Sequence, residues 1–133
     1  MTMMVTVTST LEWLESDLKH IAAQSRKDMR DTVRDGIKAG NTAARSFARR
    51  TAGAHGVHYP RAFSAEMSSD FNGFGTSVFS GEYGPDIAKP QGEMSFERGS
   101  RNQPPHLDLA RSADIVGPVF AKKVRALPDR WFW

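Results

Sequence analysis

Residues 25–51 read "SRKDMRDTVRDGIKAGNTAARSFARRT", and they carry the strongest structural signal in the chain. Their apolar and small side chains recur every three or four residues, which is the spacing of one face of an α-helix. These residues are Met29, Val33, Ile37, Gly40, Ala44 and Phe47. A basic stripe follows about a quarter-turn away, and it consists of Arg30, Arg34, Lys38, Arg45 and Arg49. The stretch therefore predicts one long helix with an apolar face and a basic face.

The residues before this helix predict a strand and a shorter helix. Residues 4–9, "MVTVTS", alternate apolar and polar side chains and are rich in β-branched types, a pattern typical of a short strand. Ser9 and Glu12 have the spacing of a capping box, so a helix is expected to begin near Thr10. Residues 22–28 could either separate this helix from the next or continue it, and both alternatives stay open.

The middle of the chain predicts a small antiparallel sheet. Gly53 and Gly56 can cap the long helix and turn the chain. Three runs containing aromatic residues follow, with turn-forming residues between them. They cover residues 61–67, 75–84 and 93–99. The first two are expected to be strands joined by a turn, and the third is another expected strand.

Two helical patterns close the chain, at residues 106–116 and 118–127, and Gly117–Pro118 separates them. Pro128 is expected to end the second helix, which leaves an aromatic C-terminal tail at residues 128–133. The order of the expected elements places the protein in the α+β class. We expect N-terminal helices that include the long basic one, a small antiparallel β-sheet and a C-terminal helix.

Length and composition restrict the classes of function. The chain has 133 residues, 39% of them hydrophobic, and a formal net charge of +3. We expect a single domain over residues 1–133, with a modest core that neighbouring subunits could complete. The absence of cysteine excludes disulfides, thiolate metal sites and cysteine nucleophiles. There is no apolar run of about 18 residues and no signal-peptide pattern, so we expect a soluble protein made in the cytoplasm, with no membrane partner.

Histidine and carboxylate side chains offer two kinds of catalytic or metal chemistry. His55 and His58 have the spacing of a metal pair, but no third ligand lies near them in the sequence. A metal-free nuclease would need an acid–base pair beside a cation. The candidates for it are His58, His106, Glu93, Glu97 and Arg101. Nothing in their spacing indicates that they converge, so we expect no metal, no cofactor and no enzyme, and a hydrolase stays a third hypothesis.

The basic stripe and the C-terminal tail are the candidate binding features. Aligned arginines can follow a phosphate backbone through sequence-independent contacts, although a solvated face with local acid–base pairs is the simpler interpretation. The stripe is therefore a candidate contact for DNA in a channel or for an acidic partner. The tail, "DRWFW", should either fold back on this chain or anchor on another subunit, because its rings are costly to leave in water. The candidate interface residues are Trp131, Phe132, Trp133, Met29, Val33, Gly40 and Ala44.

Residues 95–113, "SFERGSRNQPPHLDLARSA", resemble the neck proteins of long-tailed bacteriophages, also called head–tail connector or tail-completion proteins. In that family a strand ends in a glutamate–aromatic–glycine–threonine pattern, and a proline loop leads into a final helix. The matching turn motif here is Glu97, Gly99, Ser100, Pro104 and Pro105. The family's usual Pro-x-x-Thr-Gly-x-Leu segment is replaced by "AHGVHYPRAF", residues 54–63. We interpret the polar side chains of residues 93–109 as turn and capping groups, with Gly99 in an unusual backbone angle and His106 and Asp108 near a helix N-terminus.

The resemblance implies a non-enzymatic virion protein that forms a homo-oligomeric ring, of six or twelve copies, at the head–tail junction of a siphovirus. Its implied partners are itself, a head-closure, adaptor or portal-side protein, and a tail-tube or tail-terminator protein, with genomic DNA in the lumen. The implied location is the virion, after assembly in the host cytoplasm. Two further functions stay open, namely a small non-specific DNA-binding protein that uses the basic helix and a tail terminator that caps the tail tube.

Overall fold

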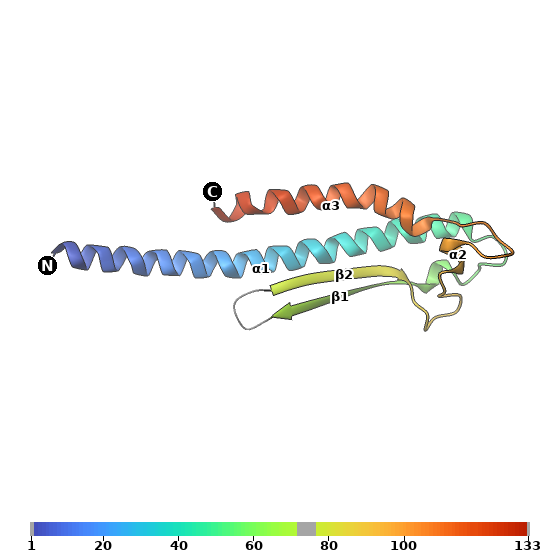
Figure 1. Cartoon of the computed structure of the whole chain (residues 1–133), viewed down its shortest axis with the longest axis horizontal. Coiled ribbons are helices and arrows are strands. Elements are labelled where there is room, and N and C mark those ends of the chain that lie inside the picture. Colours follow the sequence, from blue (N-terminus) through green and yellow to red (C-terminus); the bar gives the residue numbers. More distant parts are fainter. Residues whose placement is uncertain (1, 72–76, 133) are drawn as a thin grey trace.

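A long N-terminal helix, α1, is the spine of the molecule, and the other elements line its C-terminal half (Figure 1). The computed structural model describes residues 2–71 and 77–132, and it places side chains for residues 12–70 and 77–132. In chain order the elements are α1 (Thr2–Thr51), the 3-10 turn η1 (Pro60–Ala62), β1 (Phe63–Phe71), β2 (Ser77–Pro85), α2 (Ser95–Arg98) and α3 (Asp108–Phe132). The β-hairpin lies along one side of α1, and α3 lies along another. The class is α+β, as predicted.

Helix α1 is continuous over 50 residues, so residues 22–28 continue the helix and do not break it. The strand predicted at residues 4–9 is wrong, and so is the helix start near Thr10, because both lie inside α1. A lone strand there would leave its backbone groups unpaired, whereas a helix pairs them within the segment. Adding β-branched residues to an existing helix costs at most about 0.7 kcal/mol each. The helix ends at Thr51, and Gly53, with a φ of 62°, follows as the predicted cap.

Strands β1 and β2 form a two-stranded antiparallel sheet, in which Ala65 pairs with Tyr83 and Glu66 pairs with Glu82. The strands predicted at residues 61–67 and 75–84 are therefore confirmed in kind. Strand β1 starts two residues later than predicted and runs on to Phe71. The predicted connecting turn began at Ser68, but residues 68–71 belong to β1. The rest of that turn, together with the first two residues predicted for the second strand, falls on residues 72–76, which lie outside the described residues.

Residues 95–98 form a single helical turn, α2, so the strand predicted at residues 93–99 is wrong. The turn buries two successive side chains, Phe96 in the core and Glu97 at the start of α3. Successive residues of a strand point to opposite faces, so a strand would have turned one of the two away. Gly99 follows with a φ of 82°, which is the unusual backbone angle expected of it.

Helix α3 runs without interruption from Asp108 to Phe132. The predicted division at Gly117–Pro118 and the predicted stop at Pro128 are both wrong, because both prolines lie inside this helix. A proline costs a helix one hydrogen bond and crowds the preceding turn, a penalty that packing on α1 offsets here. Gly117 has no Cβ to clash with the Pro118 ring, which eases the helical conformation of the residue before a proline. Leu127, 4% exposed, anchors the second half of the helix.

The hydrophobic core lies near the C-terminal end of α1. Two small residues on α1, Ala44 and Ala48, are fully buried and let aromatic rings come close to the helix. Tyr59 stacks on Phe96 with ring centroids 4.4 Å apart and meets Phe63 edge-on at 5.1 Å. Such ring pairs contribute about 1 kcal/mol each beyond their buried area. The core thus fixes one end of the molecule, where the loop from α1, the turn α2 and the start of α3 meet.

Candidate functional site

The turn motif folds into a corner that ties the start of α3 to the end of α1. The Glu97 carboxylate accepts hydrogen bonds from the backbone N–H groups of Leu109 and Ala110, at 2.8 and 3.0 Å. These N–H groups belong to the first turn of α3 and have no partner within the helix. A negative charge at this end also suits the helix dipole. The interpretation of residues 93–109 as turn and capping groups is confirmed for Glu97.

Asp108 is the second buried carboxylate of the corner and the first residue of α3. The hydroxyl of Thr51, the last residue of α1, lies 3.0 Å from each Asp108 carboxylate oxygen. Burial raises the pKa of Asp108, while the hydrogen bond from Thr51 and the nearby His106 act against that shift. Burial, together with the negative charge of Asp108, also raises the pKa of Tyr59. The Thr51–Asp108 contact joins the C-terminal end of α1 to the N-terminal end of α3.

The rest of the turn motif shapes the loop between α2 and α3. Gly99 packs so tightly that a Cβ at this position would lie 2.8 Å from the Pro105 nitrogen. Ser100 donates its backbone N–H to the Gln103 carbonyl at 2.9 Å. Pro104 and Pro105 are exposed and lead the chain back, where the His106 N–H donates to the Phe96 carbonyl at 2.8 Å. The motif therefore forms a closed loop held mainly by backbone hydrogen bonds.

These hydrogen bonds show what the corner can do chemically. Both oxygens of Glu97 hold backbone N–H groups, and both oxygens of Asp108 face the Thr51 hydroxyl. His106 shares the corner, with its Nδ1 3.8 Å from an Asp108 oxygen. The other residues considered for a nuclease are exposed, and they are His58, Glu93 and Arg101. The structure thus brings Glu97 and His106 to one corner, where the carboxylates position backbone and helix ends.

The two histidines spaced like a metal pair lie in the loop after α1. His55 and His58 are both exposed. The Gln91 side chain donates to the His55 carbonyl at 2.6 Å and accepts from the His58 backbone N–H at 2.7 Å. Among the described residues, no three His, Asp or Glu side chains are placed to hold a metal ion. The loop is therefore fixed through its backbone, by a glutamine that the sequence did not single out.

The basic stripe lies on a side of α1 that is largely exposed, and acidic residues of the same helix pair with part of it. Arg34 lies 3.1 Å from Asp31 and 3.8 Å from Asp35, and Arg30 lies 3.9 Å from Asp31. Exposed pairs of this kind contribute about 0.5 kcal/mol or less. The remaining members are Lys38 and Arg49, which are exposed, and Arg45, which is half-buried. The stripe is thus a partly neutralised, solvated face.

The structure places most of the candidate interface residues against this same chain. The buried ones are Val33, Gly40 and Ala44. Met29 is half-buried, and Phe132 is 59% exposed. Trp133 lies outside the described residues. Packing within the chain therefore already covers much of the apolar stripe of α1.

Trp131 folds back onto α1, which is one of the two alternatives for the aromatic tail. Its indole N–H donates a hydrogen bond to Asp28 Oδ2 at 2.8 Å. The Gln24 side chain donates to Oδ1 of Asp28 at 3.0 Å, and Arg130 lies 3.8 Å from the same oxygen. The hydrogen bond from Trp131 lowers the pKa of Asp28, and Arg130 lowers it further, while burial acts in the opposite direction. The last turn of α3 is thus held to the middle of α1.

The Trp131–Asp28 contact should weaken in acid. A carboxylate whose folded-state pKa is lowered stabilises the fold above its unfolded pKa, about 3.9, and this contribution is lost as the pH falls through the folded value. We therefore expect the end of α3 to loosen below about pH 4. Fluorescence of Trp131 measures this, with Trp13 and Trp133 replaced by phenylalanine. Asp28→Asn should abolish the transition, and its persistence in that variant would assign it to another group.

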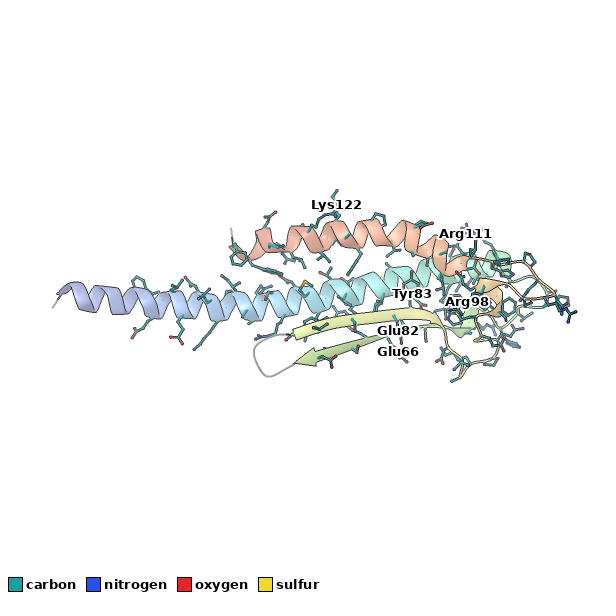
Figure 2. All side chains as sticks on the ribbon, viewed as in Figure 1. Glu66, Glu82, Tyr83, Arg98, Arg111 and Lys122 are labelled. Carbon is teal, nitrogen blue, oxygen red and sulfur yellow. The ribbon has the colours of Figure 1, made fainter. Side chains whose placement is uncertain are left out.

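Two exposed faces that the sequence analysis did not identify carry opposite charge. On the hairpin, Glu66 and Glu82 stand directly across from each other on neighbouring strands. On α3, the exposed basic residues are Arg111, Lys122, Lys123, Arg125 and Arg130, and Arg130 lies against Asp28 of α1. Figure 2 shows Lys122 pointing away from α1, while Glu66 and Glu82 lie on the hairpin at the other side of the molecule. The sequence offered only alternation within each strand, and the strand register was needed to bring the two glutamates together.

No helix in the described part of the chain combines the length and the apolar character needed to cross a bilayer. With the fold and these surfaces established, we compared the chain with protein-family models, curated proteins and solved structures, and none of them matches it.

Proposed function

We propose that this protein is a non-enzymatic structural component of the head–tail junction of a long-tailed phage, where copies of it form a ring. In this role the ring joins the DNA-filled head to the tail tube within the virion. Its neighbours are a portal-side or head-closure protein on one side and a tail-tube or terminator protein on the other, with DNA in the lumen. A tail terminator is the alternative position for the same kind of ring.

The observation that carries the proposal is the uncovered N-terminal part of α1, which extends beyond the hairpin and α3 (Figure 1). Every side chain of residues 12–20, here called the arm, is exposed. Trp13, Leu14 and Leu18 are 71%, 52% and 54% exposed. Leu14 and Leu18 are one helical turn apart and share a face. An apolar stripe in water favours association, and neighbouring subunits of a ring could bury it.

The resemblance of residues 95–113 to phage neck proteins is the reason for proposing the head–tail junction in particular. It rests on the residues of the turn motif and on the final helix that follows them, while the segment that is a strand in that family is the helical turn α2 here. The basic stripe of α1 offers a surface that tolerates DNA in a lumen, although Asp31 and Asp35 neutralise part of it. A partly neutralised stripe favours a channel wall, past which DNA must slide, over a tight DNA-binding site.

The mass of the protein in solution tests the proposal. Light scattering at several protein and salt concentrations should find a ring-sized species, or a monomer that assembles when cognate tail or portal-side proteins are added. Replacing Leu14 and Leu18 with alanine keeps the helix propensity but removes the apolar face. We expect this double variant to need at least about tenfold more protein for the same degree of assembly.

The matched control replaces Glu12 and Ser16 with alanine, because these residues lie on the other side of the arm. It should assemble like the unchanged protein. A chain that stays monomeric in every condition and responds only to DNA, with an affinity that falls steeply with salt, would contradict the ring and favour the DNA-binding alternative.

A further inference from the structure

The charges of the hairpin and of α3 point to the lateral contact of the ring. We infer that copies join head to tail, with the outer face of the hairpin of one copy docked on the outer face of α3 of the next. The hairpin face consists of Ser64, Glu66, Ser68, Ser80 and Glu82. The α3 face consists of Arg111, Ile115, Pro118, Val119, Lys122 and Arg125. This inference rests on the proposed function and names the surfaces through which the ring closes.

Along most of its length the hairpin packs one of its two faces on α1. Gly81 faces Ile37 of α1, and the Tyr83 ring lies directly over Gly40. Side chains alternate between the faces of a strand, so Glu82 and its cross-strand partner Glu66 lie on the opposite face. Both glutamates are exposed. One side of the sheet is therefore open to a partner.

This open face is acidic, and the hairpin itself has no basic residue to compensate the charge. Like charges directly opposite each other on paired strands cost up to about 1 kcal/mol. Residues 63–85 contain Glu66, Asp70 and Glu82 but no Lys, Arg or His. Within the side chains that the structure describes, neither Glu66 nor Glu82 forms an ion pair. The repulsion is relieved when a partner places cations over the pair.

Helix α3 presents the complementary surface. Three of its exposed basic residues are Arg111, Lys122 and Arg125. Their helical spacing places them on the side of α3 opposite its own buried positions. Between them Ile115 and Val119 are 56% and 53% exposed. Asp114 and Asp129 flank this face, whereas the third aspartate of the helix, Asp108, is buried in the corner. The face thus combines cations with an apolar centre.

The two surfaces also fit in shape. Apart from the glutamates, the hairpin face carries small residues, namely Ser64 and the cross-strand pair of Ser68 and Ser80. A helix can therefore lie close to the sheet, with its apolar centre over these positions. A nine-residue strand is about 30 Å long, and residues 111–125 of a helix span about 21 Å. Helix α1 already makes this kind of helix-on-sheet contact with the inner face of the hairpin.

The positions of the two faces determine the symmetry. Lys122 points away from α1 on one side of the molecule, and Glu66 and Glu82 lie on the other side (Figure 2). A contact between two different surfaces of the same chain is heterologous, and its repetition closes a ring when the rotation between copies divides a full turn. A contact of one face with itself would instead bring like charges together. The charge pattern therefore favours a ring over a two-fold dimer.

Charge reversal in two separate variants tests this contact. The first variant carries Glu66→Lys and Glu82→Lys, and the second carries Lys122→Glu and Arg125→Glu. Each variant alone sets like charges against each other and should shift the assembly midpoint at least tenfold upward in concentration. An equimolar mixture restores opposite charges at both kinds of contact, so it should assemble in alternation like the unchanged protein. Light scattering measures all three samples, and circular dichroism confirms that each variant is folded.

The outcomes separate this inference from the ring itself. If the unchanged protein assembles and the two variants assemble equally well alone, the contact is wrong while the ring stands. A mixture that fails to assemble also overturns the pairing of these two faces and favours a different partner for the acidic face, such as a divalent cation or a second protein. An unchanged protein that never assembles overturns the ring and the contact together. The control Arg26→Glu with Lys27→Glu makes the same change of charge at exposed positions of α1 outside the basic stripe, and it should assemble normally.

Discussion

Replacing Gly40 with alanine should destabilise the protein by about 2–3 kcal/mol, although alanine is the better helix former by about 1 kcal/mol. A Cβ at position 40 would lie 2.9 Å from the Tyr83 hydroxyl oxygen and closer still to two carbons of the ring. The ring cannot easily retreat, because Tyr83 bonds Ser112 of α3 at 2.8 Å. Since the Ser112 hydroxyl donates to the Leu109 carbonyl, Tyr83 is the donor in that bond. Urea unfolding followed by circular dichroism measures the loss.

The same substitution in a Tyr83→Ala background separates the clash from the helix propensity. Without the ring, alanine at position 40 should be neutral or stabilise by up to about 1 kcal/mol. The difference between the two backgrounds is the coupling between Gly40 and Tyr83. An equal loss in both backgrounds would show that the close approach of β2 to α1 is not the cause.

Replacing Glu97 with alanine should cost about 3 kcal/mol, because two backbone N–H groups at the start of α3 lose a charged partner at once. Hydrogen bonds to charged groups contribute about 1.5–3 kcal/mol each, and part of that is recovered when water reaches the freed N–H groups. Glu97 is 7% exposed, so water has little access without local opening. The measurement is again the free energy of unfolding, together with hydrogen exchange of the Leu109 and Ala110 amides, which should become faster.

Two control variants test whether the loss of stability is specific to the Glu97 carboxylate. Glu97→Gln keeps one acceptor oxygen and should lose roughly half as much. Glu93→Ala removes an exposed glutamate from the same loop and should change the stability by less than about 0.5 kcal/mol. If Glu97→Ala were as mild as Glu93→Ala, the corner would not be what holds α3 to the end of α1.

The sequence predicted those parts of the fold whose signal is long and regular. The stripe from Met29 to Phe47 covers five turns at helical spacing, and no strand can satisfy such a pattern. The strand predicted at residues 4–9 failed because six alternating residues fit a helix about as well, and the choice depended on whether a partner strand existed. The strand predicted at residues 93–99 is wrong for the same reason. Pro118 and Pro128 mislead any local prediction, because contacts with α1 offset their cost.

The candidate sites divide in the same way, into local features that the sequence predicts and contacts between elements that it does not. The turn at Glu97 and the Gly99 angle could be predicted, because both are local, whereas the bonds from Glu97 to the first turn of α3 could not. The contact of Trp131 with Asp28 joins residues that are far apart in the chain, and only the packing of α3 on α1 defines it. The pairing of Glu66 with Glu82 likewise depends on the strand register. Sequence periodicity gives the faces of single elements, whereas these sites are made between elements.

The uncovered arm has a consequence for how the chain folds. A helix of 50 residues is about 75 Å long, and α3, at 25 residues, reaches along only about half of it. Short isolated helices are marginal in water, so the helicity of residues 12–20 has little support within a single copy. Partners that cover the arm would supply that support, and helix formation there becomes thermodynamically linked to their binding. The magnitude of the helical ellipticity per residue should then rise with protein concentration, so circular dichroism would follow the binding of the arm to its partner.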